Sequence, residues 1–126
     1  MISLMSCSVL IVDDEATFRR HATRLLAIRG FRVVGEAGDA REALRAAREL
    51  EPGAVLLDVN LPDRSGVELA RDLSGLPASP RVLLTSADAD IEAEEVDRCG
   101  AIGFVPKAQL PVSDLVGLLA PGGEVV

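Results

Sequence analysis

The sequence is poor in the residues on which many catalytic and metal sites depend. Tryptophan and tyrosine are absent, and aromatic residues make up 2% of the 126 residues. A single histidine, His21, leaves almost no material for a histidine metal site or a catalytic triad. The two cysteines, Cys7 and Cys99, are too few for a disulfide framework or a four-ligand zinc site, and are most simply buried small apolar residues. No apolar run approaches the ~18 residues of a membrane-spanning helix.

Positive charge is also scarce. The chain has 13 basic and 20 acidic residues and a net charge of −7, which argues against a nucleic-acid-binding surface on this domain. Its apolar content of 48% and charged content of 26% are typical of a soluble globular domain, and its length fits one domain. Residues 1–12 are apolar but lack a positively charged start, so they predict a first strand and not a signal peptide.

Apolar runs of strand length recur along the chain and are separated by helical patterns. The expected strands are residues 8–12, 31–35, 54–57, 81–84 and 102–105. Strands that alternate with helices predict parallel pairing, with helices on both faces of the sheet. The strands are apolar almost throughout, as expected when both faces are buried. We therefore expect an α/β fold with a doubly wound five-stranded parallel sheet, flavodoxin-like in the order 2-1-3-4-5, and five helices.

The helical segments carry a periodic apolar face and recognisable ends. Two of the apolar faces are Phe18, Ala22, Leu25 and Leu26, and Ala43, Leu44, Ala47 and Leu50. The pairs Asp39–Glu42 and Ser65–Glu68 each fit a capping box at a helix start. Gly30 and Gly100 stand where a left-handed residue would end a helix. Residues 91–99 and 113–120 predict a short acidic helix and a short final helix.

Polar side chains follow four of the five expected strands. They are Asp13, Asp14 and Glu15 after the first, Asp58 after the third, Thr85 and Ser86 after the fourth, and Lys107 after the fifth. Parallel strands end at the same edge of a sheet, and the expected strand order makes these four ends neighbours. Open α/β sheets bind their ligands at this edge.

The residue types at this edge suit phosphoryl transfer. Three crowded carboxylates require a cation or would partly protonate, and all-oxygen ligands suit Mg²⁺. A lysine and a threonine hydroxyl can hold a phosphoryl oxygen, and an aspartate can act as the nucleophile that carries the phosphoryl group. Catalysis of such a transfer is mostly positioning and charge neutralisation.

With these residues in register, the sequence resembles the receiver domain of two-component response regulators. The matching motifs are Asp13-Asp14, Asp58 within LLDVNLPD, Thr85 within LLTS and Lys107 within GFVPK, together with the LPDRSG stretch at residues 61–66. The resemblance extends from about Val9 to Leu119. Each motif alone is weak, but five in register with five strand–helix units are specific together.

The resemblance implies a role for each matching residue. Asp58 would accept the phosphoryl group from a histidine kinase or phosphotransfer protein. Mg²⁺ would be bound directly by Asp14 and Asp58, partly through water by Asp13, and by the backbone carbonyl of Asn60. Thr85 and Lys107 would hold the phosphoryl group. Thr85 would also act as a switch together with Phe104, an aromatic residue that turns inward.

The resemblance further implies that the domain promotes its own phosphorylation and dephosphorylation and is otherwise not an enzyme. It implies a cytoplasmic domain, residues 1–120, followed by a tail or linker, residues 121–126. An output domain or partner protein would bind the face made by the fourth helix, fifth strand and fifth helix. Homodimerisation on phosphorylation stays open, and neither nucleic acid nor membrane is an expected partner.

Some positions depart from the family pattern. Many relatives have a proline after the lysine, but here Ala108 follows Lys107 and Pro106 precedes it, which leaves open whether the usual cis bond is present. Ala87 and Asn60 stand two residues after Thr85 and Asp58, at positions that tune the lifetime of the phosphoryl group in the family.

Simpler interpretations of the same residues also exist. Asp13 or Asp14 could cap a helix, Thr85 could be an ordinary strand residue, and Lys107 could be a solvated loop residue. Phe104 fits a core position as well as a switch position. Two other functions use similar residues: a receiver-like module that binds a partner without phosphorylation, and a haloacid-dehalogenase-type phosphatase. The phosphatase requires an acid two residues after its aspartate, where this chain has Asn60.

Overall fold

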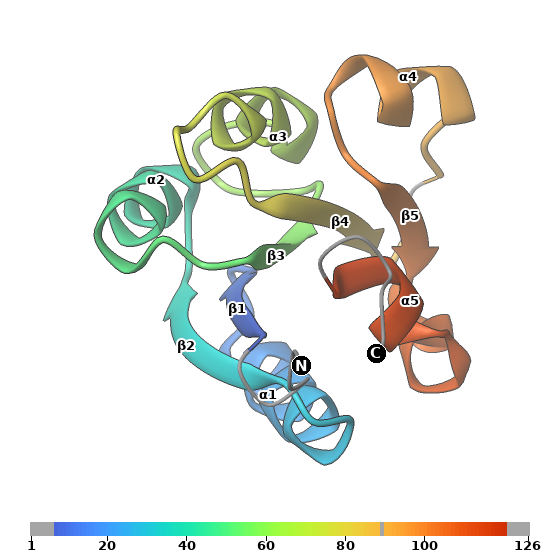
Figure 1. The fold of residues 1–126 in the computed structure, drawn as a ribbon. Helices are drawn as coiled ribbons and strands as arrows, with labels where there is room; N and C mark the ends of the chain where they lie inside the picture. The colour runs from blue at the N-terminus through green and yellow to red at the C-terminus, as the bar shows by residue number, and fades with distance from the viewer. Residues whose placement is uncertain (1–6, 89, 121–126) are drawn as a thin grey trace.

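The five strands form one parallel sheet in the order β2-β1-β3-β4-β5, as the sequence predicted (Figure 1). The computed structural model describes residues 7–88 and 90–120. The elements are β1 (Ser8–Val12), α1 (Ala16–Ile28), β2 (Arg32–Ala37), α2 (Ala40–Leu50), β3 (Ala54–Asp58), α3 (Gly66–Ser74), β4 (Arg81–Ser86), α4 (Ala93–Arg98), β5 (Gly103–Pro106), the 3₁₀ helix η2 (Lys107–Val112) and α5 (Leu115–Leu119). The predicted tail, residues 121–126, lies outside the described residues.

Helices cover both faces of the sheet and enclose two apolar layers. Successive side chains of a strand point to opposite faces, so Leu10 and Val12 pack with α2 and α3, while Val9 and Ile11 pack with α1 and α5. Figure 1 shows α2 and α3 on one face of the sheet and α1 and α5 on the other. Burial on both faces explains why the strands lack polar alternation. Within the described residues, no helix combines the length and apolar character needed to cross a membrane.

Four predicted strands end too early, including the fifth, which was predicted at 102–105 and is observed as β5 over Gly103–Pro106. The parallel ladder between β3 and β4 continues through the pair Asp58 and Thr85, so these polar residues belong to the strands and do not follow them. β2 begins at Arg32 and not at Phe31, because the Phe31 backbone N–H donates to the Leu26 carbonyl at the end of α1. β2 also extends to Ala37, opposite Val12 of β1.

The predicted glycine helix ends and the capping side chains of Asp39 and Ser65 are confirmed, but neither predicted capping box is complete. Gly30 and Gly100 have positive φ angles of 94° and 81° and stand two residues after the last residues of α1 and α4. The Asp39 side chain accepts a hydrogen bond of 2.8 Å from the Glu42 backbone N–H, but the Glu42 carboxylate accepts from Gly38 and not from Asp39. At α3 the Ser65 hydroxyl accepts from Val67, one residue earlier than a capping box requires.

The last two helices are shorter than predicted. The segment predicted at 113–120 is helical only over Leu115–Leu119, where the Asp114 side chain caps the helix by accepting from the Gly117 backbone N–H. The sequence did not predict η2, in which Pro111 lacks the N–H that an α-helix would use. α4 spans Ala93–Arg98 and not 91–99, because the preceding residue, Glu92, has an extended backbone.

The first residue of α3, Gly66, packs directly against the backbone of the phosphoacceptor candidate. A Cβ atom at Gly66 would lie 2.4 Å from the Asp58 carbonyl oxygen and 2.6 Å from the Val59 Cα. The Gly66 backbone N–H also donates to the Val59 carbonyl at 2.9 Å. A side chain here would force α3 away from the end of β3.

We expect Gly66→Ala to lower the free energy of unfolding by about 1–3 kcal/mol. The added methyl group would overpack against the rigid backbone at the end of β3 and displace α3. Urea unfolding followed by far-ultraviolet circular dichroism measures this. Gly75→Ala is the matched control, because a Cβ atom there meets its nearest neighbours at 3.6 Å and should change stability little. Equal stability of the two variants would contradict the close packing of α3 on Asp58.

Candidate functional site

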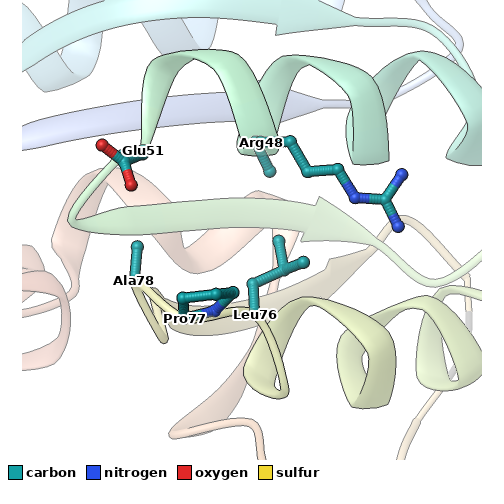
Figure 2. A pocket seen from close by; sticks show the side chains of 6 residues that line it. Arg48, Glu51, Leu76, Pro77 and Ala78 are labelled. Atoms are coloured by element: carbon teal, nitrogen blue, oxygen red, sulfur yellow. The ribbon is translucent and has the colours of Figure 1, made fainter.

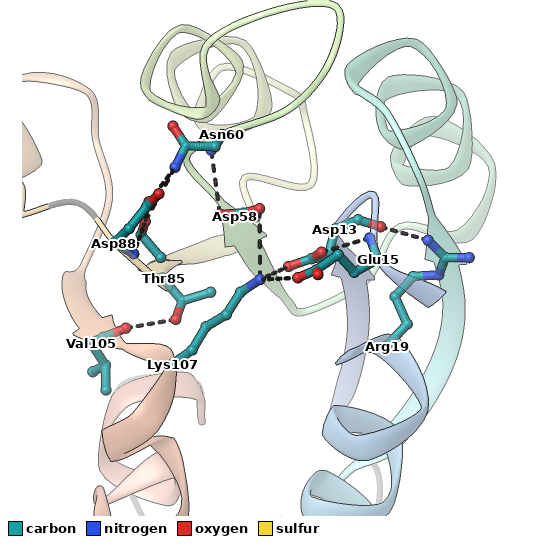
Figure 3. A network of polar contacts seen from close by, with 10 residues as sticks. Asp13, Glu15, Arg19, Asp58, Asn60, Thr85, Asp88, Val105 and Lys107 are labelled. Atoms are coloured by element: carbon teal, nitrogen blue, oxygen red, sulfur yellow. Dashed lines mark hydrogen bonds and ion pairs between the residues drawn. The ribbon is translucent and has the colours of Figure 1, made fainter. Parts of the chain in front are cut away.

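Three carboxylates meet at the carboxyl edge of the sheet. Asp13 and Asp14 follow β1, Asp58 ends β3, and one oxygen from each lies within 4.8 Å of the others. The side chains of Asp13 and Asp58 are buried, whereas Asp14 is exposed. Figure 3 shows the end of the Lys107 side chain directed toward both Asp13 and Asp58, with a dashed line from its nitrogen to each. The structure thus concentrates negative charge at the carboxyl edge of the sheet, as the sequence predicted.

Asp13 is held by one backbone hydrogen bond and one ion pair. Its Oδ1 accepts from the Glu15 backbone N–H at 2.8 Å, and its Oδ2 lies 2.7 Å from Lys107 Nζ. The N-cap residue of α1 is Glu15, so the interpretation of Asp13 or Asp14 as the cap of this helix is wrong. The Arg19 guanidinium donates to the Asp13 carbonyl at 2.6 Å and to the Glu36 carboxylate at 2.9 Å.

Lys107 is largely shielded from solvent among acidic groups and is not a solvated loop residue. Its side chain is 12% exposed, and its Nζ lies 2.7 Å from Asp13, 3.3 Å from Glu15 and 3.8 Å from Asp58. Burial lowers the pKa of Lys107, but the hydrogen bond and the charge of Asp13 outweigh burial and leave the pKa above its usual value. The ammonium therefore remains charged beside the carboxylates.

Burial and neighbouring charge act together on Asp58. Loss of solvent around its carboxylate is the largest cause that raises its pKa, followed by the negative charge of Asp13, and the result is a pKa of about 6. The backbone N–H of Asn60 donates to its Oδ1 at 3.3 Å, and this hydrogen bond and Lys107 oppose the increase. A carboxylate in this environment is stabilised by any added positive charge.

The Thr85 hydroxyl points away from the carboxylates in this structure. Thr85 is fully buried beside Asp58 in the ladder, but its Oγ1 donates to the Val105 carbonyl at 2.6 Å. Phe104, the other predicted switch residue, is half-buried on β5 and lines a groove beside Ile91 and Val96. The structure thus places the threonine in the site and the phenylalanine on the surface between α4 and β5.

Asn60 connects the two loops above the carboxylates. Its side-chain amide donates to Asp88 Oδ1 at 3.0 Å and to Ser86 Oγ at 3.3 Å, and Figure 3 shows this bridge beside Asp58. Asp88 was not predicted as part of the site. An aspartate in an acidic run carries no sequence signal that it would bond to an asparagine 28 residues away.

Asp63 was also missed as a functional neighbour. Its carboxylate accepts from the backbone N–H groups of Ala40 at 2.9 Å and Arg41 at 3.1 Å, in the first turn of α2. These hydrogen bonds, that of Ala40 first, lower the pKa of Asp63. The loop that follows Asp58 is therefore tied to the start of α2.

The peptide bonds of the described residues are all trans, including the bond between Lys107 and Ala108. The cis bond that many relatives have after this lysine is therefore absent here. The residue that follows Lys107 is Ala108 and not a proline.

A separate hollow lies where β3 and β4 begin, at the opposite edge of the sheet from the carboxylates. It has a volume of about 310 Å³ and is lined by Leu76, Pro77, Ala78, Ala47, Arg48 and Glu51. Figure 2 shows the Arg48 guanidinium directed away from Pro77 and Ala78, with Glu51 at the other end. Its lining is mainly apolar, so the carboxyl edge is the stronger candidate site.

The chain matches the response regulator receiver domain family over residues 9–118. It is 34% identical over 108 residues to the transcriptional regulatory protein PdtaR of Mycobacterium tuberculosis, covering 86% of this chain and 52% of PdtaR. It is 40% identical over 101 residues to the response regulator GacA of Pseudomonas syringae, covering 79% of this chain and 47% of GacA. The chain thus spans about half the length of these curated relatives.

Solved structures agree with the sequence comparisons. A LuxR-family response regulator from Aurantimonas has a TM-score of 0.77 at 34% identity, over 86% of this chain and 79% of that one. The receiver domain of the response regulator NarL from Mycobacterium tuberculosis has a TM-score of 0.76 at 30% identity, over 84% and 87% of the two chains. Sheet order, carboxylate cluster and relatives lead to one assignment: the chain belongs to the response regulator receiver domain family.

Proposed function

We propose that this chain is a switch in which Asp58 accepts a phosphoryl group with Mg²⁺ bound beside it. Phosphorylation-dependent switching is the general role of response regulator receiver domains. The observation that carries the proposal is the position of the Asp58 carboxylate. It is buried, its Oδ2 lies 3.8 Å from Lys107 Nζ, and it shares a cluster with Asp13 and Asp14.

The acidic cluster suits Mg²⁺ because it offers only oxygen ligands and more negative charge than one lysine balances. Asp14 and Asp58 would bind the ion directly, Asp13 partly through water, and Asn60 through its backbone carbonyl. When bound, Mg²⁺ neutralises charge on the carboxylates and on the transferring phosphoryl group.

The protein's own groups perform the transfer. A carboxylate oxygen of Asp58 attacks the phosphorus of a phosphohistidine on a partner. The P–N bond breaks, its electron pair stays on the imidazole nitrogen, and an acyl phosphate forms on Asp58. The Lys107 ammonium moves from the Asp13 side toward a phosphoryl oxygen. Attack by water later releases phosphate, so the domain promotes its own phosphorylation and dephosphorylation.

The same phosphoryl group would change the bonding of Thr85. Its hydroxyl must leave the Val105 carbonyl to donate to a phosphoryl oxygen, which alters the contacts between β4 and β5. Phe104 lies beside Val105 on β5 and would turn inward as the threonine moves. The charge added at Asp58 thereby shifts the population of states on the face made by α4, β5 and α5.

This switching defines the partners. Within the receiver family, histidine kinases supply phosphoryl groups and output domains respond to them. For this chain we propose a cytoplasmic location and a sensor histidine kinase or phosphotransfer protein as donor. An output domain or partner protein would bind the α4–β5–α5 face. Homodimerisation after phosphorylation is a further outcome that the same face could support.

The residue two positions after Asp58 argues against the phosphatase alternative. A haloacid-dehalogenase-type mechanism needs an acid two residues after the nucleophile. Here that residue is Asn60, and its amide donates to Asp88 and Ser86. A receiver-like module that binds a partner without phosphorylation is the alternative that the first experiment below addresses.

We expect incubation with acetyl phosphate to add one phosphoryl group to the chain, as measured by intact-mass spectrometry. The addition should require Mg²⁺ and should be lost in excess chelator. It should also be lost in Asp58→Asn, while the exposed-site control Asp97→Asn should react like the wild type. A folded wild type that binds Mg²⁺ but gains no mass would favour the phosphorylation-independent binding module.

We expect Thr85→Ala to be phosphorylated but to transmit the effect of phosphorylation poorly to α4 and β5. The variant has no hydroxyl that could leave the Val105 carbonyl and donate to a phosphoryl oxygen. Amide chemical shifts of α4 and β5, recorded before and after phosphorylation, measure the transmission. Thr85→Ser keeps the hydroxyl and should respond like the wild type. If Thr85→Ala showed the full wild-type shift changes, the proposed coupling through this hydroxyl would be wrong.

Stability should fall with rising pH when Mg²⁺ is absent. The folded pKa of Asp58, about 6, lies above its ordinary value of 3.8, so the folded state binds this proton more tightly than the unfolded state. The resulting stabilisation is present below pH 4 and is lost as pH rises through 6. At pH 8, Asp58→Asn should therefore be more stable than the wild type by about 1–3 kcal/mol.

Urea unfolding at pH 4.5 and pH 8 measures this difference, and Asp97→Asn serves as the exposed-site control. The advantage of Asp58→Asn should be much smaller at the lower pH. Added Mg²⁺ should stabilise the wild type at pH 8, because an ion that binds only the folded state favours folding. An advantage of Asp58→Asn that did not change with pH would rule out the raised pKa as its cause.

A further inference from the structure

The Lys107 ammonium contacts an aromatic ring as well as carboxylates. Lys107 Nζ lies 4.3 Å from the centroid of the Phe18 ring, in the first half of α1. Its closest carboxylate is Asp13 at 2.7 Å, and Asp58 is the most distant of its three acidic neighbours at 3.8 Å. The segment from the end of β1 into α1 therefore supplies three of the four groups around this ammonium.

We propose that Phe18 is a positioning residue for phosphoryl transfer. Its ring holds the Lys107 ammonium at the carboxylate cluster, within reach of the group that arrives on Asp58. This role rests on the proposed function of Asp58 as phosphoacceptor. Phe18 does not touch the reacting atoms and acts only through Lys107.

The physical reason is the flexibility of a lysine side chain. A compact ammonium on a four-carbon stem can adopt many positions, and each contact that favours one of them increases the fraction of molecules ready to react. A cation over an aromatic face is attracted by the negative charge of that face, more strongly where water is excluded. At 12% exposure the Lys107 side chain is in such an environment.

The Phe18 ring is itself fixed by its surroundings. Phe18 is half-buried and packs against the apolar layer between the sheet and α1 and α5. It also lines a groove between α1 and η2, together with Lys107, Leu25 and Leu110. One face of the ring is thus free to meet the ammonium while the rest is held by packing. Packing in the apolar layer alone would not require a cation over the ring.

Phe31 provides a matched comparison within the same apolar layer. It is buried at 5% exposure in the layer against which Phe18 packs. Phe31→Leu should reduce stability as Phe18→Leu does, because both remove aromatic packing volume. A difference between the two variants at Lys107 therefore reports on the ring and the ammonium and not on general loosening.

Lys107 is the only lysine in the sequence, which makes the test direct. The 126-residue chain labelled with ¹³C-lysine gives one set of lysine side-chain signals that need no assignment. Ring current from Phe18 should shift the signals of the end of this side chain upfield. Phe18→Leu should remove that shift, whereas Phe31→Leu should leave it in place and Phe18→Tyr should restore it.

The second measurement is the rate of phosphorylation by acetyl phosphate with Mg²⁺, followed by intact mass. Phe18→Leu should react about 2- to 30-fold more slowly than the wild type, the range expected for loss of one cation–ring contact. Phe18→Tyr should restore most of the rate, and Phe31→Leu should stay near the wild-type value. Phe18→Met replaces Phe18→Leu if the latter does not fold, because methionine refills the volume without an aromatic face.

The outcomes distinguish the role of Asp58 as phosphoacceptor from the role of Phe18 as a positioning residue. A wild type that gains no phosphoryl group overturns the proposed function of Asp58. A wild type that reacts, beside a Phe18→Leu variant with unchanged lysine signals or an unchanged rate, overturns only the positioning role. A slower rate in Phe31→Leu equal to that in Phe18→Leu also overturns it, because the effect would then be general packing.

Discussion

Crowded negative charge at one edge of the sheet is the constraint on which the site depends. Two of its three carboxylates, Asp13 and Asp58, are buried, and burial of unpaired charge costs far more than any single surface contact returns. Lys107 offsets part of this charge, and it stands closest to Asp13. The pKa of Asp58 therefore remains raised, and the site favours the binding of positive charge, which relieves the repulsion between the carboxylates.

The fold could be predicted because its determinants are local. Strand length, apolar runs and helical periodicity specify five strand–helix units, and the handedness of the connections then limits the strand order. The strand-end residues Asp58 and Lys107 could be placed at one edge for the same reason, since parallel strands share their direction. The residue pattern and the strand order were enough to place these side chains together, and the sheet has the expected order.

The contacts that tune the site could not be predicted, because they join residues distant in sequence. Asp63 accepts hydrogen bonds from the first turn of α2, 23 residues earlier in the sequence, and the Asn60 amide reaches Asp88 across two loops. The direction of the Thr85 hydroxyl depends on a neighbouring strand, since Val105 competes for it. The packing of Phe18 against Lys107 likewise depends on how α1 and η2 meet. Hydrophobic periodicity identifies the apolar face that includes Phe18 but not the cation above its ring.

These distant contacts also explain how a local charge can act on the whole domain. The loop that carries Asn60 is bonded forward to the β4–α4 loop and, through Asp63, to the start of α2. The Thr85 hydroxyl is bonded to β5, the strand that leads into Lys107. Each group that would rearrange around a charged Asp58 is therefore already bonded to a different element. A phosphoryl group on Asp58 would offer new acceptor oxygens to donors that already bond elsewhere. Packed elements respond to such an exchange of partners by changing between discrete arrangements.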